Sequence, residues 1–270
     1  MEKVRFDCWK DGKKRALTIS YDDGVFQDRR LVEIFNKYGI RGSFHLNSGL
    51  LDEESGRTVS SAEIATLYAG HEVSAHSLTH PFLERVSTAE VVHEILEDRR
   101  LLEAACGYPV RGMSYPMGTY NDAVVQMLPT LGIRYARTTK ATRKFEVPND
   151  FLLWHPTAHH NDEQLFELLE KFQKNTYPMP LFYLWGHSYE FDRNDNWDRI
   201  EQFCKEASGK EDTWYATNIE IYDYVMALRA LEFSADRSMV YNPTATDVWV
   251  RYNHESIKIP AGQLVRLEEN

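Results

Sequence analysis

The sequence predicts an α/β fold, namely a distorted (β/α) barrel with seven or eight parallel strands followed by a small C-terminal β appendage. Two observations predict the barrel. Short apolar runs alternate with amphipathic segments, and polar side chains suited to chemistry follow several of the runs. A third observation predicts the appendage, because the helical pattern stops near Phe233 and short alternating runs replace it. We expect the barrel over residues 1–231 and the appendage over residues 232–270.

The first half of the chain alternates between strand-like and helix-like segments. The expected strands are 16–20, 41–47, 72–75 and 111–115, and the expected helices are 28–38, 62–68, 88–105 and 121–131. Gly39 closes the first helix, as glycine often does. A capping box at Ser87–Glu90 opens the third helix, because the serine and the glutamate each satisfy a free backbone N–H.

The second half continues the alternation and then changes character. The expected strands are 134–137, 152–155, 181–185 and 214–216, with helices at 161–174, 197–208 and 217–229. The run 181–185 is apolar and aromatic, as a strand buried on both faces should be. Beyond residue 233 the expected strands are 239–241, 247–252, 256–259 and 264–267, which form the appendage.

Composition limits the class of protein. The chain has 270 residues, of which 43% are hydrophobic, so it can bury a sizeable core. A formal net charge of −10 argues against a nucleic-acid partner or an anionic membrane surface. No run of apolar residues is long enough to span a membrane, and the first residues have no signal-peptide pattern. With three scattered cysteines interpreted as free thiols, we expect a cytoplasmic location.

Two groups of acidic and imidazole side chains follow predicted strands. Ser20-Tyr21-Asp22-Asp23-Gly24 comes after the first strand, and His76-Ser77-Leu78-Thr79-His80 comes after the third. One carboxylate and two imidazoles suit a divalent ion such as zinc, with coordination positions left open for water. The second carboxylate is then free to handle a proton. Together these groups are the minimum that metal-assisted hydrolysis requires.

Other strand ends carry polar or aromatic groups as well. Active sites of such barrels lie at the C-terminal ends of the strands, so these residues are candidates for the barrel mouth. The candidates are His45, Tyr115, Trp154, His155, Trp185 and His187. The aromatic ones could stack on sugar rings or simply pack in the core. An isolated Asp-Asp-Gly is usually a turn, and His187 could be a packed histidine.

The residues before the helix predicted at 161–174 have a simpler interpretation. His159 and His160 are expected on the surface. Asn161 is expected to be the N-cap of this helix, which is a structural role.

Taken in order, the motifs resemble the polysaccharide deacetylases of carbohydrate esterase family 4, also known as the NodB-homology domain. The resemblance extends from about residue 17 to residue 187, and more loosely to about residue 229. It implies a distorted βα barrel. For the first motif it implies that Asp22 is the catalytic base and Asp23 a metal ligand. The second motif implies that His76 and His80 complete the metal site. The fifth motif, Leu184-Trp185-Gly186-His187, implies that His187 is the general acid.

Two of the family's five motifs are altered. The third is usually Arg-Pro-Pro-Tyr-Gly, whereas this chain has Ser114-Tyr115-Pro116-Met117-Gly118 and so lacks the arginine that steadies the base. We expect Arg111 to take that role and orient Asp22. The resemblance places the oxyanion-binding N–H at Met117. The aspartate of the fourth motif, which tunes the acid, has no counterpart. The alternatives for tuning His187 are Glu190, Asp192 and His155.

The resulting expectation is a metal-dependent hydrolase that removes acetyl groups from an N-acetylated, or alternatively O-acetylated, carbohydrate. The expected metal is Zn²⁺, with Co²⁺, Ni²⁺ or Mn²⁺ as alternatives, and the expected partner is an acetylated sugar or oligosaccharide. Two rival functions are hydrolysis of another amide, such as a cyclic imide or ureide, and non-catalytic carbohydrate binding. Retention of Asp22 argues against the second rival, because binding alone requires no base. The sequence leaves the oligomeric state open.

Overall fold

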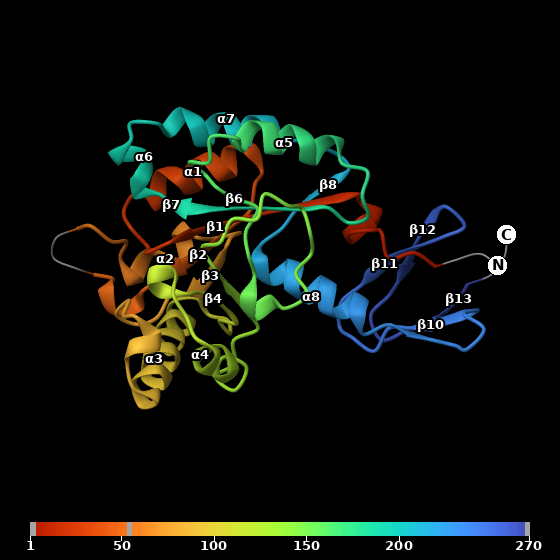
Figure 1. Cartoon of the computed structure of the whole chain (residues 1–270), viewed down its shortest axis with the longest axis horizontal. Helices are drawn as coiled ribbons and strands as arrows, with labels where there is room; N and C mark the ends of the chain where they lie inside the picture. The colour runs from red at the N-terminus through yellow and green to blue at the C-terminus, as the bar shows by residue number, and fades with distance from the viewer. Residues whose placement is uncertain (1–3, 53–55, 268–270) are drawn as a thin grey trace.

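A curled, all-parallel sheet forms the centre of the molecule. The computed structural model describes residues 4–52 and 56–267. Within them the sheet runs in the order β5-β4-β3-β2-β1-β7-β6, and β8 pairs with the start of β1 (Figure 1). The strands are β1 Arg15–Asp22, β2 Gly42–Leu46, β3 Glu72–Ala75, β4 Gly112–Ser114, β5 Tyr135–Arg137, β6 Ala158–His159, β7 Leu181–His187 and β8 Thr213–Tyr215. Among the described residues the edge strands β5 and β6 do not pair with each other, and a parallel bridge from Arg137 to Trp154, just ahead of β6, joins the two edges, so the barrel is distorted. The predicted fold class is confirmed.

The central strand β1 determines where the C-terminal ends of its neighbours lie. All of its residues are buried, as in a parallel sheet covered on both faces. On one side it pairs with β7 along its length, and on the other it pairs first with β8 and then with β2. This register sets Asp22 level with His45 on β2 and with His187 on β7. The ends of three strands therefore meet at one point.

Helices cover the sheet. They are α1 Asp28–Tyr38, α2 Ile64–Leu67, α3 Thr88–Cys106, α4 Asp122–Met127, α5 Leu165–Lys174, α6 Tyr189–Arg193, α7 Trp197–Ala207 and α8 Asn218–Arg229. Short 3₁₀ turns occupy 10–12, 48–50, 61–63, 83–85, 116–118 and 151–153. Helices α1, α5 and α7 lie together on one face (Figure 1). Helix α1 buries Leu31 and Phe35 in the core and ends at Gly39, whose φ of 64° suits glycine.

Some expectations about secondary structure are wrong in the second half of the chain. The strand expected at 152–155 is replaced by a 3₁₀ turn at 151–153, because the Asp150 side chain accepts the N–H of Leu152 and begins a turn there. The nearby strand β6 is at Ala158–His159 instead. Helix α5 begins at Leu165 rather than at Asn161. Helix α6, directly after β7, was not expected.

The predicted C-terminal strands are present, and they pair in an antiparallel manner. Strands β9 (Glu232–Phe233), β10 (Met239–Tyr241) and β13 (Leu264–Arg266) form one small sheet, and β11 (Val248–Tyr252) and β12 (Glu255–Ile259) form a hairpin. They lie at the end of the barrel away from α6 (Figure 1). The Tyr224 hydroxyl on α8 accepts the N–H of Trp249 at 3.1 Å and so connects the hairpin to the barrel.

Two features expected from composition can be compared with the structure. No described helix combines the length and apolar character needed to cross a lipid bilayer. The cysteines are free thiols, of which Cys8 and Cys204 are buried and Cys106 is half-buried.

Candidate active site

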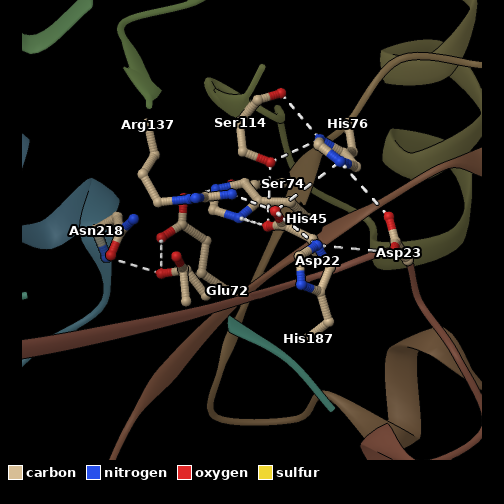
Figure 2. Close-up of polar contacts among 12 residues, drawn as sticks. Asp22, Asp23, His45, Glu72, Ser74, His76, Ser114, Arg137, His187 and Asn218 are labelled. Atoms are coloured by element: carbon tan, nitrogen blue, oxygen red, sulfur yellow. Dashed lines mark hydrogen bonds and ion pairs between the residues drawn. The ribbon is translucent and has the colours of Figure 1, made fainter. Parts of the chain in front are cut away.

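Asp22 and Asp23 point to different places although they are adjacent in the chain. Asp22 is the last residue of β1, and its side chain is almost fully buried. Asp23 has a φ of 81°, in the left-handed region that aspartate tolerates better than most residues. Its N–H donates to the carbonyl of His45 at 2.9 Å, and Gly24 is left-handed as well. This sharp turn directs the Asp23 carboxylate towards His76 (Figure 2).

The loop that carries His76 and His80 is held in place by helix α3. The buried Asp98 carboxylate accepts the N–H of His76 at 3.0 Å, and Glu94 accepts the N–H and the hydroxyl of Thr79 at 2.8 and 2.6 Å. Burial raises the pKa of Asp98 to about 7. His80 has a φ of 61°, a left-handed conformation that turns its ring back towards His76. This role of α3 was not expected from the sequence.

Three side chains converge as a candidate metal-ligand set. Nε2 of His76 lies 3.1 Å from Nε2 of His80, and Oδ1 of Asp23 lies 3.5 and 3.7 Å from these two nitrogens. Nδ1 of His76 is 2.9 Å from the carbonyl oxygen of Ser114, which can only accept a hydrogen bond. Nδ1 therefore carries the proton, and the lone pair of Nε2 faces the other two ligands. Burial lowers the pKa of His76 to about 3, which keeps the ring neutral. This donor set fits a divalent metal such as zinc.

Asp22 lies beside the ligand set in a different environment. Its carboxylate forms an ion pair with Arg137, lies 3.2 Å from Nδ1 of His45, and accepts a hydrogen bond from the Ser114 hydroxyl at 3.1 Å. Figure 2 shows Arg137 and His76 approaching it from opposite sides. Burial alone would raise the pKa of Asp22, but the charge of Arg137 and the contacts with His76 and His45 outweigh it. They hold this pKa well below its usual value, so Asp22 is a carboxylate.

The prediction that Arg111 orients Asp22 is wrong. Arg111 precedes β4 and is therefore at the N-terminal end of that strand, away from the site. Its guanidinium binds Asp223 on α8 through two hydrogen bonds of 2.9 and 2.7 Å. Arg137, the last residue of β5, takes the expected position instead. Ser114 and Arg137 are register partners on neighbouring strands, so the arginine reaches Asp22 from one strand further along the sheet.

His187 faces the two aspartates from the end of β7. Its Nε2 lies 4.0 Å from an oxygen of Asp22 and 4.0 Å from one of Asp23, and its Nδ1 lies 3.5 Å from Glu190 Oε1. Burial alone would lower the pKa of His187. The carboxylates of Glu190, Asp22 and Asp23 outweigh this effect and raise it. A histidine that holds its proton next to the pocket is suited to be a general acid.

Several predicted substrate-binding residues are buried and are not exposed at the barrel mouth. Tyr115 is 1% exposed and donates its hydroxyl proton to the Leu152 carbonyl, and Trp154 is 1% exposed and packs in the core. His45 is fully buried against Asp22. For these three residues the prediction is wrong, because a buried side chain cannot contact a sugar.

The remaining predicted residues have different surroundings. Trp185 is largely buried, and its ring lies 4.2 Å from the Arg137 guanidinium carbon, so it supports Arg137 and is not an open platform for a sugar. His155 is half-buried with its Nδ1 2.6 Å from the Thr138 hydroxyl, and its role in substrate binding stays a prediction. Met117 has a left-handed φ of 58° and an exposed side chain.

Comparison with known proteins links this geometry to a family. The sequence model of the family described as polysaccharide deacetylase matches residues 10–136, which include Asp22, Asp23, His76 and His80. Residues 10–136 therefore resemble the polysaccharide deacetylase family in sequence. This chain is 28% identical over 126 residues to the peptidoglycan-N-acetylglucosamine deacetylase PgdA of Listeria monocytogenes, covering 43% of this chain and 24% of that protein.

Another curated relative and two solved structures extend the comparison. A chitooligosaccharide deacetylase from a Bradyrhizobium species is 37% identical over 65 residues, covering 24% of this chain and 30% of that protein. This chain thus aligns with less than a third of either curated relative. A structure from Mycobacterium smegmatis described as a polysaccharide deacetylase superposes with a TM-score of 0.62 at 17% identity, covering 85% of this chain and 96% of that one. The Xyl-CE4 domain of a xylanase from the Trinervitermes trinervoides hindgut metagenome gives 0.53 at 14% identity, covering 78% and 91%. These two structures support the fold alone.

Groups from other parts of the chain lie where two of the family's motif residues are missing. Arg137 on β5 pairs with Asp22, whereas the resemblance would place an arginine in the third motif. Glu190 on α6 contacts His187, where the family uses an aspartate from the fourth motif. The position of Arg137 could have been noticed in the sequence, because it is the last residue of a predicted strand and the other candidate site residues also lie at the ends of predicted strands. Glu190 was one of three alternatives, and the structure favours it.

Proposed function

We propose that this protein is a metal-dependent hydrolase that removes acetyl groups from an N-acetylated, or alternatively an O-acetylated, carbohydrate. One observation carries this proposal: the two adjacent aspartates are separated into two chemical environments. Asp23 lies with His76 and His80 in a ligand set, whereas Asp22 is held by Arg137, with its Oδ2 3.9 Å from Nε2 of His76. The match to the deacetylase family supports the acetylated carbohydrate as the substrate class.

The chain's own residues provide positions for base, acid and oxyanion donor. A divalent metal held by Asp23, His76 and His80 would supply Lewis acidity, lowering the pKa of water and polarising the acetyl carbonyl. Asp22 accepts a proton from the attacking water, and Arg137 holds its carboxylate in place. His187 donates a proton to the departing amine, which leaves poorly as an anion. The N–H of Met117 stabilises the oxyanion.

Zinc is the metal that we propose first, with Co²⁺, Ni²⁺ or Mn²⁺ as alternatives. Two imidazoles and one carboxylate are a donor set typical of catalytic zinc sites, which leave a position open for water. The exposed edge of this ligand set supports such a position, since His80 and Asp23 are only partly buried. Measuring acetate release from acetylated mono- and oligosaccharides, with and without each metal, tests the function. No release from any of them with metal bound would contradict it.

The same experiment distinguishes the rival functions. Cyclic imides and ureides belong in the substrate panel, because the groups that attack an acetamide also suit other amides. Turnover of these compounds alone would favour the rival hydrolase. Stoichiometric metal and sugar binding without turnover would favour a binding protein. The ion pair between Arg137 and Asp22 argues against that outcome, because sugar binding alone does not need an ionised base inside the barrel.

His187→Ala should separate substrates according to their leaving groups. We expect turnover of N-acetyl sugars to fall by about 10²–10⁴-fold, the usual contribution of a positioned acid. Activated aryl acetates should lose much less, because their leaving group needs little protonation. Measuring kcat for both substrate types checks this expectation. An equal loss for both would argue against His187 as the acid.

We also propose that residues 1–231 form the catalytic unit and residues 232–270 an appendage. Every proposed ligand and proton-transfer residue precedes residue 231, whereas Val240, Val248 and Val250 of the appendage are fully buried in a cluster with Trp9. A chain ending at residue 231 should keep its metal stoichiometry but melt at a lower temperature, because this cluster would be exposed. Metal content and thermal unfolding measure both effects. Loss of metal from a folded, truncated chain would contradict the division.

A further inference from the structure

Glu190 is the centre of a cluster of histidines next to the proposed acid. It lies on α6, three residues after His187, and its side chain is largely buried. Its Oε2 is 3.2 Å from Nε2 of His159 and 2.9 Å from Nε2 of His160. Its Oε1 is 3.5 Å from Nδ1 of His187. The prediction that His159 and His160 are surface residues is therefore wrong, since His160 is buried and both rings face this carboxylate.

His159, His160 and Glu190 are close enough to hold a metal, but the proton positions argue against it. The backbone N–H of Asn161 donates to Nδ1 of His159 at 3.1 Å. Nδ1 is therefore the acceptor, so the neutral ring carries its proton on Nε2, the atom that faces Glu190. A metal ligand needs a lone pair there. In His76 the proton positions are reversed, because its Nδ1 faces a carbonyl oxygen.

The same contacts fix the position of the Glu190 carboxylate. Oε2 accepts a hydrogen bond from the Asn161 side-chain amide at 3.1 Å and has the two histidine Nε2 atoms around it. Asn161 was expected to be the N-cap of α5. That position is occupied by Gln164 instead. Nδ1 of His160 lies 3.1 Å from the buried Tyr21 hydroxyl, which anchors that ring to β1. Oε1 accepts a hydrogen bond from the exposed Arg193 guanidinium at 3.3 Å and also faces Nδ1 of His187.

We propose that Glu190 is the positioning residue of His187, and that His159 and His160 hold Glu190 in place. This inference rests on the proposed function. The buried Nδ1 of His187 makes no hydrogen bond within the described residues, and Glu190 Oε1 is at ion-pair distance from it. A small rotation of the ring would bring Nδ1–H into a hydrogen bond, as catalytic contacts often tighten once substrate binds. Nε2 then faces the space between Asp22 and Asp23, where a leaving amine would be protonated.

The two other groups considered for tuning His187 are engaged elsewhere. The Asp192 carboxylate accepts hydrogen bonds from Trp197 Nε1 at 2.7 Å and from the Gln27 side chain at 2.9 Å. His155 contacts Thr138. Asp192→Ala is therefore a matched control, because it removes a carboxylate from the same short helix without touching the histidine cluster.

The test compares Glu190→Ala and Glu190→Gln with Asp192→Ala in the metal-loaded, full-length protein. We expect Glu190→Ala to lower kcat on an N-acetyl substrate by about 10- to 100-fold, the usual effect of losing an orienting partner. Hydrolysis of 4-nitrophenyl acetate should fall far less, and metal content should not change. In Glu190→Gln, which keeps the side-chain volume, we expect a smaller loss with the same selectivity. Asp192→Ala should behave like the wild type.

Combining Glu190→Ala with His187→Ala tests whether the two residues act together. If Glu190 acts through His187, the double variant should be no slower than His187→Ala alone. Additive losses, equal losses on both substrates, or the disappearance of a second bound metal would each overturn the proposal. The last outcome would make the cluster a metal site.

A measurement that needs no turnover keeps this test separate from the proposed function. The ¹⁵N and ¹³C signals of the His187 ring report which nitrogen of the neutral ring carries the proton. We expect the Nδ1–H form in the wild type and in Asp192→Ala, and a mixture in Glu190→Ala. The same mixture in the wild type would overturn the role of Glu190. If the wild type shows the Nδ1–H form but releases no acetate, the function fails and the positioning role stands.

Discussion

Asp22→Asn should leave the metal bound and nearly abolish turnover. The three proposed ligands, Asp23, His76 and His80, remain in this variant, so metal content should stay near that of the wild type. An amide cannot accept a proton from water, and loss of a positioned base typically costs about 10²–10⁴-fold in rate. The side chain keeps its size, and its amide oxygen still accepts from the Ser114 hydroxyl. Metal analysis and acetate release from one preparation measure both effects.

Asp23→Asn is the matched comparison, because the same change is made one residue later in the chain. It removes the only anionic member of the proposed ligand set, so metal affinity should fall markedly. Activity should recover partly when metal is added in excess, whereas Asp22→Asn should not respond. If Asp22→Asn loses its metal or stays active, the proposed division of labour between the two aspartates is wrong.

Arg137→Met should cost both stability and activity. The guanidinium is fully buried, pairs with the buried Asp22 carboxylate and lies over the Trp185 ring. Removing one partner of a buried ion pair leaves an uncompensated charge and typically lowers the free energy of unfolding by about 3–5 kcal/mol. Without the arginine, burial acts on Asp22 with less compensation, so its pKa should rise and the acidic limb of the activity profile should move to higher pH. Thermal unfolding and a pH profile of kcat/KM check both effects.

Arg111→Met is the control for this experiment. It removes an arginine that pairs with Asp223 at the other end of β4, where the pair is partly exposed. Partly exposed ion pairs typically contribute only about 0–1 kcal/mol to the free energy of unfolding. We therefore expect thermal stability to change slightly and the pH profile of kcat/KM to stay the same. If Arg111→Met instead shifts the acidic limb and Arg137→Met does not, the assignment of the two arginines has to be reversed.

The sequence by itself was sufficient for features that depend on local pattern. The strand before Asp22 and Asp23 and the strand before the His76–His80 loop are short apolar runs that end where the polar motif begins. The capping box at Ser87–Glu90 opens α3, as expected. Parallel strands end at the same edge of a sheet, so motifs that follow strands come together there. The candidate metal-ligand set and the position of His187 could be predicted for this reason.

The tertiary structure decided which long-range partners support these residues. Arg111 is the first residue of one predicted strand and Arg137 the last of another. Only the register between β4 and β5 shows that Arg137 is level with Ser114 and reaches Asp22. Burial was equally hard to predict. Tyr115 ends one predicted strand and Trp154 lies near the end of another, yet both side chains are buried in the core. The curvature of the sheet and the packing of its neighbours determine which side chains face the mouth of the barrel.

The histidine cluster is the clearest case of a feature that only the tertiary structure decided. The short helix α6 begins directly after β7, and five residues give too weak a periodic signal to predict a helix. Without that helix, nothing indicates that Glu190 turns back towards His187 and meets His159 of β6 and His160 directly after it. The chemistry of this site is thus encoded in short motifs at strand ends. Its support comes from strand register and packing, which depend on residues far apart in the chain.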